Sequence, residues 1–183
     1  MTLNNYINSF QRLHVSRSQG VAPHKLVLLI SVLDEIESGR IIENKICITP
    51  ELVATFKENW ATLVDSKIFT PTFALPFYHL KNDKFWHLVT FPGCEIAVTS
   101  SNSIRSFSPL KAAVDCASFD EVLFQYLVQP DKRAMLRIIL LDTYFANTKQ
   151  KYIRAKGNQG RYIASIEMKL LNEPLVEYKR EIS

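Results

Sequence analysis

An apolar segment between Pro23 and Gly39 restricts the fold more than any other feature of the sequence. Pro23 suits the first turn of a helix, where its missing N–H is not needed, and Gly39 suits the C-terminal end. Between them, apolar residues fall on nearly every side of the expected helix: Leu26, Val27, Leu28, Leu29, Ile30, Val32 and Leu33. A helix that is apolar all round needs cover on every side. We therefore predict that this helix lies at the centre of the core.

Helical spacing of apolar residues recurs before and after this segment. Residues 3–16 have it, and Thr49-Pro50 marks the start of a third helix in which Leu52, Val53, Phe56 and Trp60 share a face. Residues 118–121 read as a capping box that opens a further helix. Pro130 begins another helix, and residues 160–171 fit one more after a flexible basic link. Most of the chain is therefore expected to be helical.

The pattern changes between residues 69 and 98, where aromatic residues cluster. Residues 78–80 and 85–89 flank a polar segment, 81–84, which predicts an aromatic hairpin around a turn. Residues 95–99 could supply a third strand. We expect an α+β fold, mainly helical with a small antiparallel sheet or hairpin.

Charge is distributed unevenly along the 183 residues. Residues 147–183 carry eight Lys or Arg and four Asp or Glu, so this tail accounts for the whole net charge of +4. We therefore expect a neutral domain over residues 1–146, followed by a basic linker and C-terminal helix over 147–183. A basic segment permits nucleic-acid binding without establishing it.

Several classes of protein do not fit the sequence. The apolar run Leu26 to Leu33 is far shorter than the roughly 20 residues of a membrane span, and the N-terminus lacks the features of a secretory signal. Cys47, Cys94 and Cys116 form no CxxC pair, which argues against a disulfide framework or a structural zinc site. The sequence is that expected of a cytoplasmic protein, and we predict no cofactor in it.

Sequence templates of known catalytic sites are missing. There is no GxSxG, HExxH, P-loop or GxGxxG motif. His79 and His87 would approach each other if they lay on opposite arms of the predicted hairpin, and with an acid they could hold a metal. A metal-dependent nuclease or hydrolase therefore stays open as an alternative, although two structural histidines explain the same pattern.

Three short segments could bind a ligand. His24 and Lys25 fall in the first turn of the central helix, where the helix dipole favours an anion and a bound phosphate would offset the unfavourable position of the Lys. Equally, Lys25 could simply extend into solvent while His24 caps the helix or packs against it. Residues 75–80 would present an apolar patch beside polar groups, or simply a core strand. Residues 100–106 place short hydroxyl and amide side chains around Arg105, which suits phosphate contact as well as a solvated connector.

The strings APHKLVLLISVLDEIESG and LPFYHLKNDKFWHLV, in this order and with a Trp-containing helix between them, carry a resemblance. Residues 6–146 resemble the DNA-binding domain of McrA-like HNH restriction endonucleases, the sulfur-binding domain that recognises phosphorothioate-modified DNA. This resemblance implies that the chain is a specificity module for double-stranded, modified DNA. A type IV-like enzyme of this kind carries an HNH nuclease after the module, and only that nuclease would need a divalent metal.

The resemblance also assigns roles to residues. His24 and Lys25 match a family His and basic residue that contact DNA, and Arg105, with Ser101 and Asn102 beside it, matches a further basic position. The family lines its sulfur pocket with a Tyr-Pro-x-x-Ala pattern. Here the corresponding pocket residues would be Leu75, Pro76, Tyr78 and His79, and of the pattern only the Pro is retained. The departures at Leu75 and His79 are expected to affect selectivity for sulfur, whereas binding to the DNA backbone does not depend on them.

Three functions therefore follow from the sequence, in decreasing order of support. The first is a module that binds phosphorothioate DNA through an apolar pocket rimmed by cations. The second is a metal-dependent nuclease in its own right. The third is a regulatory or protein-interaction domain in which the basic tail, residues 147–183, binds an acidic partner.

Overall fold

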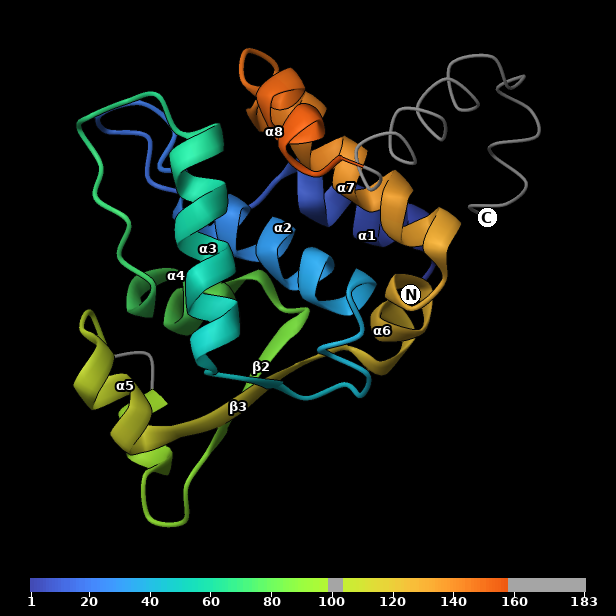
Figure 1. Ribbon diagram of the computed structural model, residues 1–183. Coiled ribbons are helices and arrows are strands. Elements are labelled where there is room, and N and C mark those ends of the chain that lie inside the picture. The colour runs from blue at the N-terminus through green and yellow to red at the C-terminus, as the bar shows by residue number, and fades with distance from the viewer. Residues whose placement is uncertain (99–103, 158–183) are drawn as a thin grey trace.

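A computed structural model of the protein describes residues 1–98 and 104–157. Helix α2 (His24–Glu37) lies at its centre, and all but the last of its residues are buried. It packs against α3 (Pro50–Leu63), α4 (Ala74–His79) and α7 (Pro130–Tyr144), as Figure 1 shows. The predicted central helix is confirmed, and Gly39 adopts the left-handed conformation (φ 81°) that favours glycine just beyond a helix end.

Further helices cover the remaining sides of this core. α1 (Leu3–Gln11) packs on α7 and on α6 (Glu121–Leu127). Its N-terminus is closed by a capping box in which the Thr2 hydroxyl accepts from the Asn5 N–H and the Asn5 side chain accepts from the Thr2 N–H. The Thr49 hydroxyl caps α3 in the predicted way. The helices expected from residues 3, 50 and 130 are therefore confirmed.

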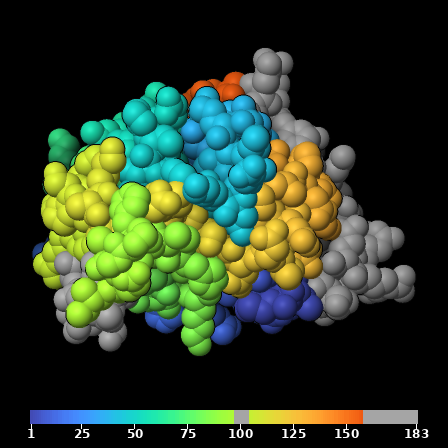
Figure 2. All heavy atoms as spheres, turned by 90° about the horizontal axis from the view of Figure 1, so that it is seen from below, coloured from blue at the N-terminus to red at the C-terminus, as the bar shows by residue number. Residues whose placement is uncertain are grey.

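A three-stranded antiparallel sheet lies below α2 and α3 in Figure 1. Its strands β1 (Ile46–Cys47), β3 (Val114–Phe119) and β2 (Trp86–Thr90) pair in that order. Figure 2 views this side from below and shows the segments around β2 and α5 (Phe107–Ala113), in green and yellow, side by side. The fold is α+β and mainly helical with a small antiparallel sheet, as the sequence predicts.

The predicted aromatic hairpin is wrong. Residues 74–79 form α4, and Leu80–Asp83 continue it as a 3₁₀ turn, η1. β2 pairs with β3, which the sequence did not reveal as a strand, rather than with residues 78–80. Glu95–Val98 form a second 3₁₀ turn, η2, where a strand was expected. The aromatic side chains meet in the core in both arrangements, which is why composition alone could not tell them apart.

The capping box predicted at residues 118–121 is also wrong. Ser118 belongs to β3, and α6 begins at Glu121 with Asp120 as its N-cap residue. The Asp120 carboxylate makes no capping bond. It accepts instead from the Tyr6 hydroxyl at 3.0 Å and lies 2.6 Å from Nε2 of His87.

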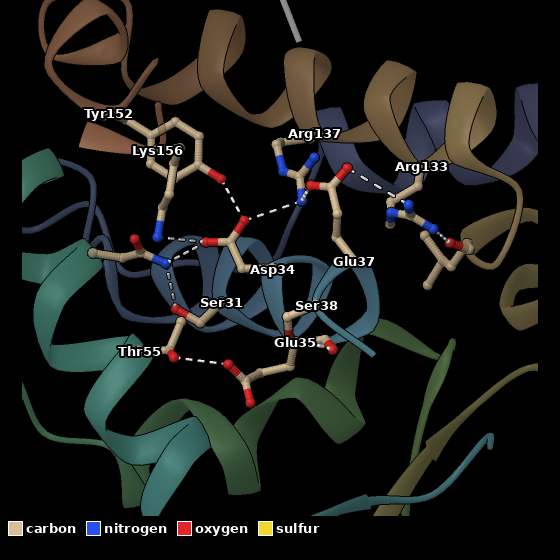
Figure 3. Close-up of polar contacts among 12 residues, drawn as sticks. Ser31, Asp34, Glu35, Glu37, Ser38, Thr55, Arg133, Arg137, Tyr152 and Lys156 are labelled. Carbon is tan, nitrogen blue, oxygen red and sulfur yellow. Dashed lines mark hydrogen bonds and ion pairs between the residues drawn. The ribbon is translucent and has the colours of Figure 1, made fainter. Parts of the chain in front are cut away.

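A buried polar node joins α2 to the helices around it. The Asp34 carboxylate accepts hydrogen bonds from Arg137 of α7, from Asn59 of α3 and from Tyr152, and it pairs with Lys156 (Figure 3). Arg137 is fully buried and also pairs with Glu37 at 2.8 Å. One carboxylate thus fixes the relative positions of several helices that are distant in sequence.

The start of the basic tail is part of this packed body rather than a flexible link. α8 (Lys149–Ala155) packs against α3. Its lysines pair with exposed acids of the packed body: Lys149 pairs with Asp142 of α7 at 2.7 Å, and Lys151 pairs with Asp65 at 3.0 Å. The described part of the tail therefore offers an acidic partner fewer free charges than the sequence suggests. The helix predicted at 160–171 lies outside the described residues.

None of the helices in the described parts of the chain is both long and apolar enough to cross a membrane.

Candidate functional site

A hollow of about 240 Å³ opens beside the first turn of α2. Five residues that the sequence singled out line it, namely His24, Lys25, Leu75, Pro76 and His79. The rest of the lining consists of His14, Val15, Ser16, Ala22 and Asn82. Two segments that lie fifty residues apart in the sequence are therefore brought to a single site, which we call the α2–α4 pocket.

Helix α4 sets the geometry of one wall. In a helix, residues i, i+1 and i+4 lie on neighbouring parts of one face, so Leu75, Pro76 and His79 can face the hollow together. Pro76 falls in the first turn of α4, where its missing N–H leaves no helical hydrogen bond unmade. A strand would have sent Leu75 and Pro76 to opposite faces, so the helical conformation is what builds this wall.

Lys25 does not extend freely into solvent. Its ammonium group donates to the Asp83 carboxylate at 2.7 Å and to the His14 carbonyl at 2.6 Å, and the residue is buried. Asp83 is buried too and also accepts from the backbone N–H of His14 at 2.8 Å. The anion that offsets the Lys at this helix end is therefore a carboxylate of the protein. Lys25 therefore lines the pocket while its charge is paired with that of Asp83.

His24 is held as a neutral ring. Its Nε2 lies 2.8 Å from the Thr70 carbonyl, which requires a proton on that nitrogen. The ring lies against Trp60 at a centroid distance of 4.8 Å and edge-on to Phe69. Burial lowers the pKa of His24, and the bond to Thr70 opposes this only in part. Nδ1 is buried without a hydrogen-bond partner in the described structure. His24 therefore brings no positive charge to the pocket of the free protein at neutral pH.

His79 is also kept from charging. Burial lowers the pKa of His79, and the positive charges of Lys25, Lys81 and Arg105 lower it further. This influence places Arg105 in the electrostatic surroundings of the pocket, although Arg105 is exposed and is not among the lining residues. Its contact with a ligand remains a prediction.

The other predicted site residues lie elsewhere. Tyr78 is fully buried on α4 and is not among the residues that line the pocket. Its ring packs edge-on against His79 and lies beneath the Lys81 ammonium at 4.9 Å. Ser101 and Asn102 lie outside the described residues.

Sequence reasoning missed Asp83 and His14. Asp83 was read as the tip of a turn, whereas it is the buried partner of Lys25. His14 stands at the mouth of the pocket with its side chain 71% exposed and its Nδ1 3.0 Å from Asp83. The only signal in the sequence was the scarcity of acids near residues 12–25, which leaves Lys25 without a local partner.

The metal site considered for His79 and His87 does not form. His79 lies on α4, whereas His87 lies on β2 with Asp120 as its partner. Within residues 1–98 and 104–157, no group of three or more His, Cys, Asp or Glu side chains is placed to hold a metal ion.

The lowered pKa values of His24 and His79 predict that the folded protein is less stable in acid. In the unfolded chain both imidazoles regain a pKa of about 6.5, so below that pH the unfolded state binds more protons than the folded state. The free energy of unfolding should therefore fall as the pH drops through about 6.5. Urea unfolding of the wild type and of His24→Gln at pH 7.5 and 5.5 tests this. We expect the smaller loss in the variant, and an equal loss would show that His24 does not contribute.

Comparison with known proteins gives structural likeness alone. No family model and no curated protein matches the sequence. The sulfur-binding domain of ScoMcrA, solved with phosphorothioated DNA, matches with a TM-score of 0.58 and 18% identity over 86% of this chain and 98% of that chain. A second structure, the sulfur-binding and SRA domains of ScoMcrA with phosphorothioated DNA, matches with a TM-score of 0.58 and 17% identity over 80% of this chain.

The chain corresponds to only part of the larger ScoMcrA structures. It spans 46% of the chain that contains both the sulfur-binding and SRA domains. It spans 29% of the type IV phosphorothioation-dependent restriction endonuclease itself, again at a TM-score of 0.58 and with 18% identity. This protein therefore has the fold of the sulfur-binding domain of ScoMcrA.

Proposed function

We propose that this chain is a DNA-binding specificity module that recognises phosphorothioate-modified duplex DNA at the α2–α4 pocket. The observation that carries the proposal is the convergence of His24, Lys25, Leu75, Pro76 and His79 on one hollow. The fold is shared with a domain that has been solved with phosphorothioated DNA. The sequence resemblance pointed to the same residues.

The chemistry of sulfur suits such a pocket. A sulfur that replaces a non-bridging phosphate oxygen is larger, more polarisable and more weakly hydrated than the oxygen. Leu75, Pro76 and Ala22 offer it apolar surface. An oxygen at the same place would lose hydrogen bonds to water without replacement, at a cost of about 1–3 kcal/mol. That difference corresponds to a preference of roughly 5- to 150-fold.

The electrostatics of the pocket favour discrimination over tight general binding. Lys25 is matched by Asp83, and His24 is neutral. Cations that attract any phosphate raise affinity for modified and plain DNA alike. A pocket with little free positive charge leaves more of the binding free energy to the apolar contact with sulfur.

His79 is the residue that departs most from the family pattern, which has Ala at this position. A neutral imidazole at the pocket occupies space that a methyl group would leave open. We infer that His79 narrows the pocket and lowers its preference for sulfur relative to a pocket that carries Ala.

Matched variants of α4 test this reading. Pro76→Ala removes the ring but preserves the helix, and we expect it to reduce the ratio of phosphorothioate to plain duplex affinity about threefold or more, since it removes part of the apolar wall. His79→Ala should raise that ratio. Fluorescence anisotropy with both duplexes gives the ratio directly, and a ratio unmoved by either variant would mean that sulfur is not read at this pocket.

The larger enzyme belongs to the same proposal. By analogy with ScoMcrA, the module would direct a type IV-like HNH endonuclease to modified DNA. The nuclease and its divalent metal would be supplied by another domain, and residues 1–157 would supply recognition.

A further inference from the structure

We propose that a second hollow beside the α2–α4 pocket is a binding site for an unmodified phosphate of the same DNA duplex, with Arg12 and Lys84 as its cations. This inference rests on the proposed function and adds a site that neither the sequence resemblance nor the pocket residues identify. The hollow has a volume of about 280 Å³. It is lined by Met1, Asn8, Ser9, Arg12, His14, Asp83, Lys84, Phe85 and Asp120.

The two hollows are neighbours. His14 lines both of them. Asp83 lines the second hollow, while its ion-pair partner Lys25 lines the first. Each strand of a duplex carries a phosphate about every 3.4 Å along the helix axis. A strand held at the first hollow would therefore bring further phosphates close to the second.

The acids in the second hollow are already matched by donors of the protein. Asp83 accepts from Lys25 and from His14. Asp120 pairs with His87 and accepts from the Tyr6 hydroxyl at 3.0 Å. Burial and then the bond to Asp120 raise the pKa of Tyr6 to about 12, so this phenol remains a donor at neutral pH. The ammonium of Lys25 offsets the charge of Asp83, and the hydrogen bonds to Asp120 disperse part of its charge, so both carboxylates repel a phosphate less than free ones would.

The two cations of the second hollow, in contrast, are available to bind a phosphate. Arg12 and Lys84 are exposed, and neither takes part in an ion pair within the described residues. Arg12 stands at the C-terminal cap of α1, and Asn8 and Ser9 from the last turns of α1 add polar groups beside it. An Arg fork and a Lys point charge with nearby hydrogen-bonding side chains are the usual partners of a phosphodiester.

The backbone at Lys84 supports this reading. Lys84 has φ 68° and is the only non-glycine residue with positive φ in the described chain. A side chain is disfavoured in this conformation, whereas a glycine adopts it without strain. Glycine would serve this turn better than lysine, and the proposed phosphate site accounts for a lysine here.

Charge-removing variants of similar length test the second site. Arg12→Gln and Lys84→Gln should each weaken binding to plain and phosphorothioate duplexes by the same factor, about three- to tenfold at 0.1 M salt. The ratio between the two duplexes should not change. The slope of log affinity against log salt should fall by about 1 for each variant. Lys57→Gln, on the exposed face of α3 and outside both hollows, is the matched control and should bind like the wild type.

The outcomes separate this inference from the proposed function. If the wild type prefers phosphorothioate but both variants bind like Lys57→Gln, the second site is wrong and the sulfur proposal stands. If the wild type binds both duplexes equally and the variants still weaken binding, the second site stands and the sulfur proposal fails. A change in the ratio caused by Arg12→Gln or Lys84→Gln would overturn the assignment to an unmodified phosphate. Absence of duplex binding by the wild type would overturn both.

Discussion

Replacing Asp34 with Ala is expected to lower the free energy of unfolding by about 3–5 kcal/mol, because it leaves buried cations without their acceptor. Arg137 donates to Asp34 at 3.0 Å and Lys156 pairs with it at 3.0 Å. Tyr152 donates at 2.5 Å. Arg137 is fully buried, and among the described residues it would retain only Glu37 as an ion-pair partner, so the variant must bury uncompensated charge or open the packing around α7 and α8.

Urea unfolding measures this loss, and Asp65→Ala is the matched control. Asp65 also pairs with a lysine of α8, Lys151 at 3.0 Å, but both side chains are more than half exposed. An exposed pair contributes at most about 1 kcal/mol. Equal losses in the two variants would show that the Asp34 node is no stronger than a surface ion pair.

Lys25→Met is expected to destabilise the protein by a similar amount, about 3–5 kcal/mol, because it leaves the buried Asp83 carboxylate unpaired. Lys25→Met combined with Asp83→Asn should recover most of that loss. The Asn oxygen can still accept from the backbone N–H of His14, and no buried charge remains. Urea unfolding of the wild type, the two single variants and the double variant gives a double-mutant cycle for this pair. A double variant as unstable as Lys25→Met would contradict the pairing.

The same variants separate folding from DNA binding. Asp83→Asn releases the Lys25 ammonium, so we expect stronger binding to plain duplex and a smaller preference for phosphorothioate. The double variant removes the cation while remaining folded, and it should bind plain duplex more weakly than Asp83→Asn. If these two proteins bind alike, Lys25 does not act on DNA.

The central helix could be predicted because its signals are local. Pro23 and Gly39 lie at its ends, and the apolar run between them leaves one solution, a helix covered on all sides. Helix α4 was mistaken for a strand because its aromatic residues have high strand propensity. Phe73, Phe77 and Leu80 follow helical spacing, and these buried side chains were the better signal.

Other features depend on contacts between distant parts of the chain. β3 forms because it pairs with β1 on one side and β2 on the other, and a short segment of mixed residues carries little sign of this. The Lys25–Asp83 pair joins positions 58 apart, and the Asp34–Tyr152 bond joins positions 118 apart. The sequence could therefore indicate five residues of the pocket, but not that its lysine is already paired.

Competition between duplexes of one sequence, phosphorothioate, methylated and plain, tests the central claim most directly when performed with the full chain at two salt concentrations. We predict that the phosphorothioate duplex competes roughly 5- to 150-fold better than the plain duplex. This ratio should be nearly the same at both salt concentrations, although each affinity falls as salt rises. Equal competition by all three duplexes, or a preference for the methylated one, would contradict the assignment of the α2–α4 pocket to sulfur.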